Sequence, residues 1–180
     1  EEDSESATVS IANIAPDLEI SMDSTAGEGT THSLYAEASD VEADTVSIAW
    51  DFGGGVTASG EEVSHTWADD GDYTVTVTAS DEDGGETIET VTISVHNIAP
   101  TLEATVLDNR GDEGDSFTFT ALTNDVADDT VTVTWDYGDG SNAADLAVTH
   151  QHTFTDDGTF VVEITATDED GGTTVVKLYI

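Results

Sequence analysis

The sequence predicts an all-β protein made of two tandem β-sandwich repeats, and two observations carry that prediction. The first is internal repetition: Asn-Ile-Ala-Pro at 13–16 recurs at 97–100, and Trp-Asp-Phe-Gly at 50–53 recurs as Trp-Asp-Tyr-Gly at 135–138. The second is alternation of apolar and polar residues, with no convincing helical period. The offset between copies grows from 84 residues at Asn13 to 87 residues at His65, as insertions in loops would produce.

Alternation is clearest at 73–79 and in its counterpart at 160–166, where β-branched residues are frequent, as in a half-buried strand. Further strands are expected at 18–22, 33–38, 45–52, 63–67 and 87–95, with glycine-rich turn signals between them. Six or seven short strands in roughly 80 residues predict an immunoglobulin-like sandwich. We place the repeats at 14–96 and 97–180. Residues 1–13 are interpreted as an acidic lead-in that contains the tail of a preceding repeat. The sequence is therefore expected to be part of a longer series of such repeats.

The chain is extremely acidic, with 40 Asp and Glu against two basic residues and a formal charge of −38. Such charge disfavours nucleic acid or an anionic membrane as a partner, because both would be repelled. High charge also fits a disordered chain. The strict apolar patterning favours instead a folded protein whose acidic surface is screened by concentrated salt, where the Debye length falls to roughly 3 Å. There is no cysteine, and no apolar run approaches the length of a membrane span.

Two motifs in the correct order, each present twice, resemble those of the PKD (polycystic kidney disease) domain. The first stands complete at 135–141 as Trp-Asp-Tyr-Gly-Asp-Gly-Ser, whereas the first repeat has Gly54 in place of the preferred Asp. The second runs from His65 to Asp81 and from His152 to Asp168. The resemblance implies an immunoglobulin-like sandwich that serves as a spacer, adhesion or accessory module, usually in secreted or surface proteins.

Calcium is the one ligand that the sequence suggests, because Ca²⁺ takes six to eight oxygen ligands and acids cluster in the expected loops. In an immunoglobulin-like layout the loop after the second strand, the loop before the last strand and the linker asparagine meet at one end of the sandwich. This arrangement resembles that of PKD-like and cadherin-like repeats, which place calcium near such linkers. The candidate ligands of the second repeat are Asn97, Asp125, Asp128, Asp168 and Asp170, and those of the first are Asn13, Asp40, Glu42, Asp44, Asp81 and Asp83. Glu28, with Asp69, Asp70 or Asp72, is expected to face the inter-repeat junction.

Simpler explanations exist for the same residues. Acids on a halophilic surface need no metal, and the Asp-Glu-Asp-Gly-Gly loops at 81–85 and 168–172 also suit turns in which glycine takes a positive φ. His65 and His152 are expected to make structural hydrogen bonds, and Asp51 and Asp136 to accept backbone N–H groups in turns. The three tryptophans are expected in the cores. No serine nucleophile elbow, zinc-type histidine cluster or phosphate-binding glycine motif is present.

The sequence therefore predicts a non-catalytic spacer or adhesion segment of a large extracellular surface protein, such as a surface-layer, stalk or adhesin chain of a halophile. Its expected partners are neighbouring repeats of the same chain, other surface subunits or surface polysaccharide, with no membrane contact from this segment. Two alternatives remain open: an accessory module of a secreted hydrolase, and a carbohydrate-binding module.

Overall fold

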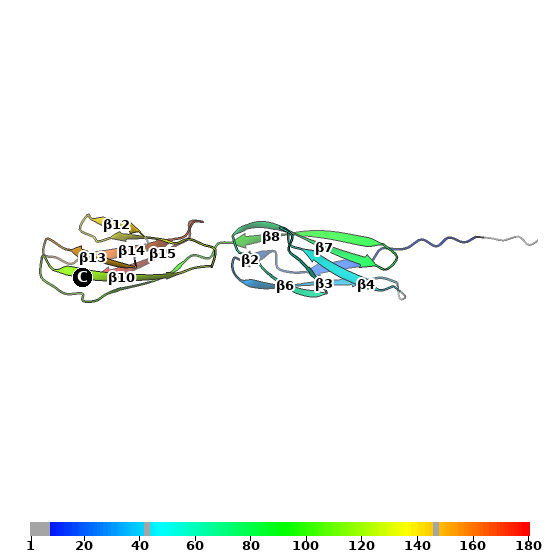
Figure 1. The fold of residues 1–180 in the computed structure, drawn as a ribbon, viewed down its shortest axis with the longest axis horizontal. Coiled ribbons are helices and arrows are strands. Elements are labelled where there is room, and N and C mark those ends of the chain that lie inside the picture. The colour runs from blue at the N-terminus through cyan, green and yellow to red at the C-terminus, as the bar shows by residue number, and fades with distance from the viewer. Residues whose placement is uncertain (1–7, 42–43, 146–147) are drawn as a thin grey trace, which may run out of the picture. The chain divides into compact units, whose positions relative to one another are not determined.

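A computed structural model describes residues 8–41, 44–145 and 148–180, and these residues form strands, turns and loops with no helix among them. The predicted all-β fold class is confirmed (Figure 1). By backbone contacts the chain divides into two compact units. Of the described residues, the first unit comprises 8–26, 31–41, 44–65 and 72–94, and the second comprises 27–30, 66–71, 95–145 and 148–180. Two short loops of the first sequence repeat, 27–30 and 66–71, thus belong to the second unit.

The first sandwich is formed by a three-stranded sheet of order β1-β3-β6 and a five-stranded sheet of order β2-β8-β7-β4-β5. Its strands are β1 (Asp17–Ser21), β2 (Thr25–Gly27), β3 (Thr31–Ser39), β4 (Val46–Asp51), β5 (Thr57–Ser59), β6 (Glu62–Thr66), β7 (Gly71–Asp81) and β8 (Glu86–His96). The pairings β1–β3 and β4–β7 are antiparallel, with Leu18 opposite Ala38 and Trp50 opposite Val77.

The second sandwich is formed by sheets of order β13-β10-β9 and β12-β11-β14-β15. Its strands are β9 (Thr101–Val106), β10 (Ser116–Asn124), β11 (Thr132–Asp136), β12 (Asn142–Asp145), β13 (Thr149–Thr153), β14 (Val161–Thr167) and β15 (Thr173–Tyr179). In β14 the buried positions alternate with half-buried ones, because successive side chains of a strand point to opposite faces.

Each sandwich has its own apolar core. In the first unit the buried apolar residues include Ala26, Leu34, Ala36, Ile48, Trp50, Phe52, Val75, Val77, Ala79 and Ile93. In the second it includes Leu102, Phe117, Phe119, Ala121, Val133, Trp135, Tyr137, Phe154, Val162, Ile164 and Ala166. All three tryptophans are buried, as expected from their apolar strand positions.

The Trp-Asp-aromatic-Gly turns are braced by their aspartates, as predicted. Asp51 Oδ1 accepts the N–H of Gly53 at 2.8 Å, and Asp136 Oδ1 accepts the N–H of Gly138 at 2.9 Å. In the second repeat Asp139 also contacts His152 Nε2 at 2.6 Å, which gives that histidine the expected structural contact with a loop. Gly54 occupies the equivalent of Asp139 and has no side chain for such a contact, so the two turns differ as the sequence indicated.

Gly138→Ala is expected to destabilise the protein more than Gly53→Ala. Both glycines have a positive φ, 76° and 86°, so both substitutions incur a backbone cost of roughly 1–2 kcal/mol. At Gly138 an added Cβ would also lie 2.6 Å from the backbone oxygen of Val161, whereas nothing lies within 4 Å at Gly53. Denaturant unfolding of the two variants measures the difference, and equal losses of stability would contradict the steric explanation.

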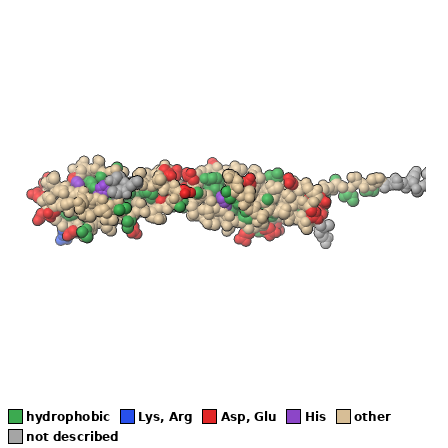
Figure 2. All heavy atoms as spheres, viewed as in Figure 1, with side chains coloured by type: hydrophobic (Ala, Val, Ile, Leu, Met, Phe, Trp, Pro, Cys, Tyr) green, Lys and Arg blue, Asp and Glu red, His purple; other side chains and the backbone are tan. Residues whose placement is uncertain are grey.

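The acidic residues lie mainly on the outside of the sandwiches, and red side chains are spread over the face seen in Figure 2. Some acids directly oppose each other: Glu19 and Glu37 are cross-strand partners on β1 and β3, and both are exposed. Like charges in such pairs are destabilising. The ion pair between Lys177 and Glu163, at 2.7 Å, is half-exposed and offsets little of this repulsion.

Candidate metal centre

The loop between β14 and β15 is organised by the buried carboxylate of Asp168. Asp168 Oδ1 accepts the backbone N–H groups of Asp170 at 3.1 Å and Gly172 at 2.7 Å. Asn97 Nδ2 donates to both oxygens of the same carboxylate at 3.1 Å. The linker asparagine and the last loop therefore meet as predicted. The same bonds also brace a turn, in which Gly171 has a φ of 88°, so the simpler explanation of this loop holds as well.

The first sandwich contains a copy of this arrangement. Asn13 Nδ2 donates to Asp81 Oδ2 at 2.9 Å, while Asp81 Oδ1 accepts the N–H groups of Asp83 at 2.9 Å and Gly85 at 2.8 Å. The hydrogen bond from Asn13 is the main reason that the pKa of Asp81 lies below its ordinary value, with backbone N–H groups contributing in the same direction. The Asn-Ile-Ala-Pro motif is thus a device that attaches the entering chain to the last loop of the sandwich.

Three carboxylates of the second unit form a compact group, which we term the Asp125 group: Asp125, Asp129 and Asp168 each place an oxygen within 4.8 Å of the others. Asp125 Oδ2 and Asp129 Oδ2 are buried and have no donor among the described residues, and the same is true of Asn97 Oδ1. Burying a carboxylate without a donor or a counter-charge is costly. These oxygens are therefore suited to a cation that prefers oxygen ligands.

The electrostatics of Asp129 reflect that cost. Its pKa is raised to about 6, first by burial and then by the neighbouring carboxylates of Glu28, Asp125, Glu169 and Asp170, because each opposes another negative charge. Glu169 has a different role, because its carboxylate accepts hydrogen bonds from both the N–H and the hydroxyl of Thr130, and these bonds lower its pKa.

Asp128, which the sequence analysis included, is exposed and lies outside the Asp125 group, whereas Asp129 lies within it. The repeat offset contained the signal for the better choice. Asp40 and Asp44 in the first repeat align with Asp125 and Asp129 at the same offset of 85, and Asp44 was already among the first-repeat candidates. Applying one offset to both acids selects Asp129 rather than Asp128.

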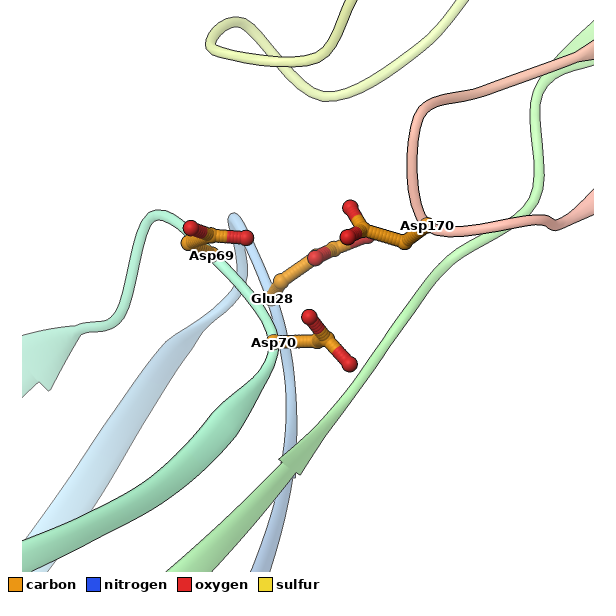
Figure 3. A group of neighbouring side chains, drawn as sticks. All are labelled: Glu28, Asp69, Asp70 and Asp170. Carbon is orange, nitrogen blue, oxygen red and sulfur yellow. The ribbon is translucent and has the colours of Figure 1, made fainter.

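A second group in the same unit, the Glu28 group, consists of Glu28, Asp69, Asp70 and Asp170, whose oxygens also lie within 4.8 Å of one another. Figure 3 shows Glu28 lying between the loop that carries Asp69 and Asp70 and the loop that carries Asp170. Glu28 has no exposed surface. Its Oε1 accepts the N–H of Ile98 at 2.7 Å, and its Oε2 is buried with no partner among the described residues.

Asp170, predicted as a ligand beside Asp168, lies in the Glu28 group instead. Burial raises its pKa, and repulsion from Asp70, Asp69, Glu169 and Glu28 acts in the same direction. Of the three acids expected near Glu28, Asp69 and Asp70 are members of the group, whereas Asp72 is not. Asp69 and Asp70 are exposed, so the group joins one fully buried carboxylate to solvent-accessible ones.

The first-repeat candidates are less tightly grouped. Glu42 lies outside the described residues. Among those that are described, Asn13, Asp40, Asp81 and Asp83 do not form a set of three carboxylates within ligand distance. The pKa of Asp44 is nevertheless raised, first by burial and then by the negative charges of nearby carboxylates, those of Asp40, Glu82, Asp83 and Asp81.

Asp139, Ser141 and His152 contain the residue types of a catalytic triad but not its geometry. His152 Nε2 faces Asp139 at 2.6 Å and Ser141 Oγ at 3.5 Å, while Ser141 Oγ donates to Asp139 at 2.5 Å. In a triad the carboxylate binds the imidazole nitrogen opposite the one that faces serine. Here the carboxylate competes for that same nitrogen and for the hydroxyl, which is the arrangement of a braced turn. The pKa of Asp139 falls to about 2 because hydrogen bonds from Ser141 and His152 outweigh its burial.

Within the described parts of the chain, no helix has the length and apolar character required to cross a bilayer.

The model of the PKD domain family matches residues 13–95 and again residues 97–179. Among solved structures, the PKD1 domain of Vibrio anguillarum Epp is 30% identical, with 48% of this chain and 100% of that chain covered and a TM-score of 0.41. The PKD domain of an M14-like peptidase from a Thermoplasmatales archaeon is 27% identical, with coverages of 45% and 92% and a TM-score of 0.37. The fibronectin(III)-like modules of Clostridium thermocellum CbhA are 17% identical, with coverages of 91% and 93% and a TM-score of 0.41.

PKD and immunoglobulin-like domains are generally non-catalytic modules, and PKD domains are typically extracellular. Because the family model matches twice and spans nearly all of the sequence, this chain belongs to the PKD domain family and carries two tandem copies of the domain.

Proposed function

We propose that this chain is a non-catalytic spacer or adhesion segment of a large extracellular surface protein of a halophile, and that calcium bound at the Asp125 group stiffens its linker. The observation that carries the calcium proposal is the set of buried oxygens on Asp125, Asp129 and Asn97 that have no donor among the described residues. The chain has only two basic residues, so the counter-charge has to come from solution. Oxygen ligands without nitrogen or sulfur favour a hard cation such as Ca²⁺.

The proposed mechanism is mechanical. Asn97 already ties the start of the linker to Asp168, and Pro100 is buried and has a restricted φ. An ion bound by Asp125, Asp129 and Asp168 would hold the loop at 124–130 and the loop at 168–172 together beside that asparagine. Asn97 Oδ1 is a further buried oxygen without a partner among the described residues, and as a ligand of the same ion it would make bending of the linker break a metal–ligand bond. A chain of such repeats would gain reach without needing an active site.

The halophile proposal rests on the surface charge and on the exposed like-charged pair Glu19–Glu37. A surface of this kind is stable where salt screens it. The carbohydrate-binding alternative receives less support, because Trp50, Trp67 and Trp135 are all buried and present no ring face to a sugar. Tyr35 and Tyr179 are exposed, but they lie on β3 and β15, in different sandwiches, and so do not form one platform.

Millimolar CaCl₂ is expected to raise the melting temperature of the chain after a chelator has removed bound metal, in concentrated KCl. An ion that binds only the folded state stabilises that state by about 2.7 kcal/mol when its concentration is a hundred times its Kd. Asp129→Asn should raise the melting temperature of the metal-free chain, because it removes a charge that burial and its neighbours already oppose. The same variant should reduce the response to calcium. Thermal unfolding followed by circular dichroism measures both effects.

Asp128→Asn is the matched control, because it removes the same charge from the exposed neighbouring position. It should keep the full calcium response. Equal responses from the two variants, or a wild-type shift that KCl of equal ionic strength reproduces, would refute the calcium proposal.

A further inference from the structure

We infer that the Glu28 group is a second calcium site, separate from the Asp125 group. The inference deepens the proposed function, on which it rests for the identity of the ion, but it concerns different ligands. The two groups have no residue in common: one consists of Asp125, Asp129 and Asp168, and the other of Glu28, Asp69, Asp70 and Asp170.

Glu28 is buried in a way that calls for a positively charged partner. Its side chain is completely buried, and a buried carboxylate needs a partner for each oxygen. Oε1 has one in the N–H of Ile98, at 2.7 Å. Oε2 has none among the described residues. An oxygen of the same carboxylate lies within 4.8 Å of oxygens of Asp69, Asp70 and Asp170, and Figure 3 shows the Glu28 side chain extending among them. An acidic cluster on an exposed surface would not require a ligand, but this unpaired, buried oxygen does.

The position of Glu28 is built by the backbone. Its N–H donates to the carbonyl of His96 at 3.2 Å, and the N–H of Gly29 donates to the carbonyl of Trp67 at 2.7 Å. Gly29 has a φ of 64°, and a Cβ at this position would lie 2.5 Å from the side chain of Val126. These contacts hold the loop at 27–30 in place, so the buried carboxylate is preorganised rather than free to turn towards solvent.

The spacing of the four carboxylates fits a single ion. Oxygens bound to one Ca²⁺ lie about 2.3–2.6 Å from it, so two of them cannot be more than about 5 Å apart. The four ligand oxygens of the group meet that limit, because they lie within 4.8 Å of one another. Four carboxylates leave further coordination positions for water, which can reach the group because Asp69, Asp70 and Asp170 are exposed.

The second repeat contains an equivalent group of acids on its surface. Glu113, Asp156 and Asp157 occupy the equivalent positions in the second repeat and also lie within 4.8 Å of one another, but all three are exposed. Among the described residues, none of these three carboxylates has a buried, unpaired oxygen. Surface acids of this kind need no metal, so the equivalent group provides the control that separates a binding site from acidic composition.

Calorimetric titration of the full chain with CaCl₂, after a chelator has removed bound metal, tests the inference. Concentrated KCl is present because it suppresses nonspecific binding of Ca²⁺ to the acidic surface. The wild type is expected to bind two ions. Asp70→Asn, at an exposed position that should not disturb folding, is expected to weaken one of the two sites by at least about tenfold, as loss of one charged ligand would. Asp157→Asn, the matched control at the equivalent position, should leave both sites unchanged.

The outcomes separate this inference from the proposed function. A single ion that Asp125→Asn abolishes and Asp70→Asn leaves unchanged would overturn the second site while the proposed function stands. An ion that Asp70→Asn weakens and Asp125→Asn leaves unchanged would support the Glu28 site and overturn the Asp125 site. Equal effects of Asp70→Asn and Asp157→Asn would show that only surface charge is being measured, and would refute the inference.

Discussion

Transfer of the chain from concentrated KCl to dilute buffer containing a chelator is expected to unfold both sandwiches. A net charge of −38 with two basic residues leaves the surface almost without compensating ion pairs, and Glu19 and Glu37 repel each other directly across β1 and β3. In dilute buffer this repulsion acts over about 30 Å, whereas at molar salt it is limited to roughly 3 Å. A folding free energy of about 5–15 kcal/mol is too small to withstand it.

Far-ultraviolet circular dichroism measures the loss of strand signal, and titration with KCl should restore it. Sucrose at matched osmolality is the control, because it does not screen charge. Retention of the full β signal in dilute, calcium-free buffer would contradict the proposal that the fold depends on screening.

Trp135→Ala is expected to lower the free energy of unfolding of the second sandwich by about 3–5 kcal/mol, the usual cost of removing a buried aromatic side chain. Trp135 is 1% exposed, and its ring packs against Phe119 and His150 at centroid distances of 6.4 Å and 4.8 Å. Neighbouring strands cannot close a cavity of that size without distorting the sheets. Denaturant unfolding measures the loss, and a change below about 1 kcal/mol would contradict the assignment of Trp135 to the core.

A conservative pair of variants separates packing from hydrogen bonding. Trp50 Nε1 donates to the carbonyl of Gly60 at 2.9 Å, whereas Trp135 Nε1 has no acceptor among the described residues. Trp50→Phe should therefore cost more than Trp135→Phe, because only the first leaves a carbonyl without its donor.

The long strands could be predicted from sequence because alternation is a direct consequence of strand geometry. The expected strands at 18–22, 73–79 and 87–95 correspond to β1, β7 and β8. The strands that sequence reasoning missed are short: β2 and β5 have three residues each and β12 has four. All three lie at the edges of their sheets. An edge strand pairs on one side only, and so few residues cannot display a period.

The candidate site was harder to predict, because acids are abundant throughout the chain and their spacing alone does not show which are buried. The repeat identified Asn97 and Asp168, since the asparagine and the last loop are conspicuous in both copies. It did not show that Glu28 is fully buried, that Asp170 lies with Glu28 rather than with Asp168, or that Asp129 replaces Asp128. Those facts depend on the course of the backbone through loops, where a shift of one residue turns a carboxylate from solvent to the interior.

The central claim is that buried carboxylates of the second unit hold calcium, and equilibrium dialysis of the chelated chain against calcium in concentrated KCl tests it most directly. We predict saturable binding of two ions to the wild-type chain and its loss in the double variant Asp70→Asn, Asp125→Asn. Binding that never saturates, or that is the same in the wild type and the double variant, would contradict the claim.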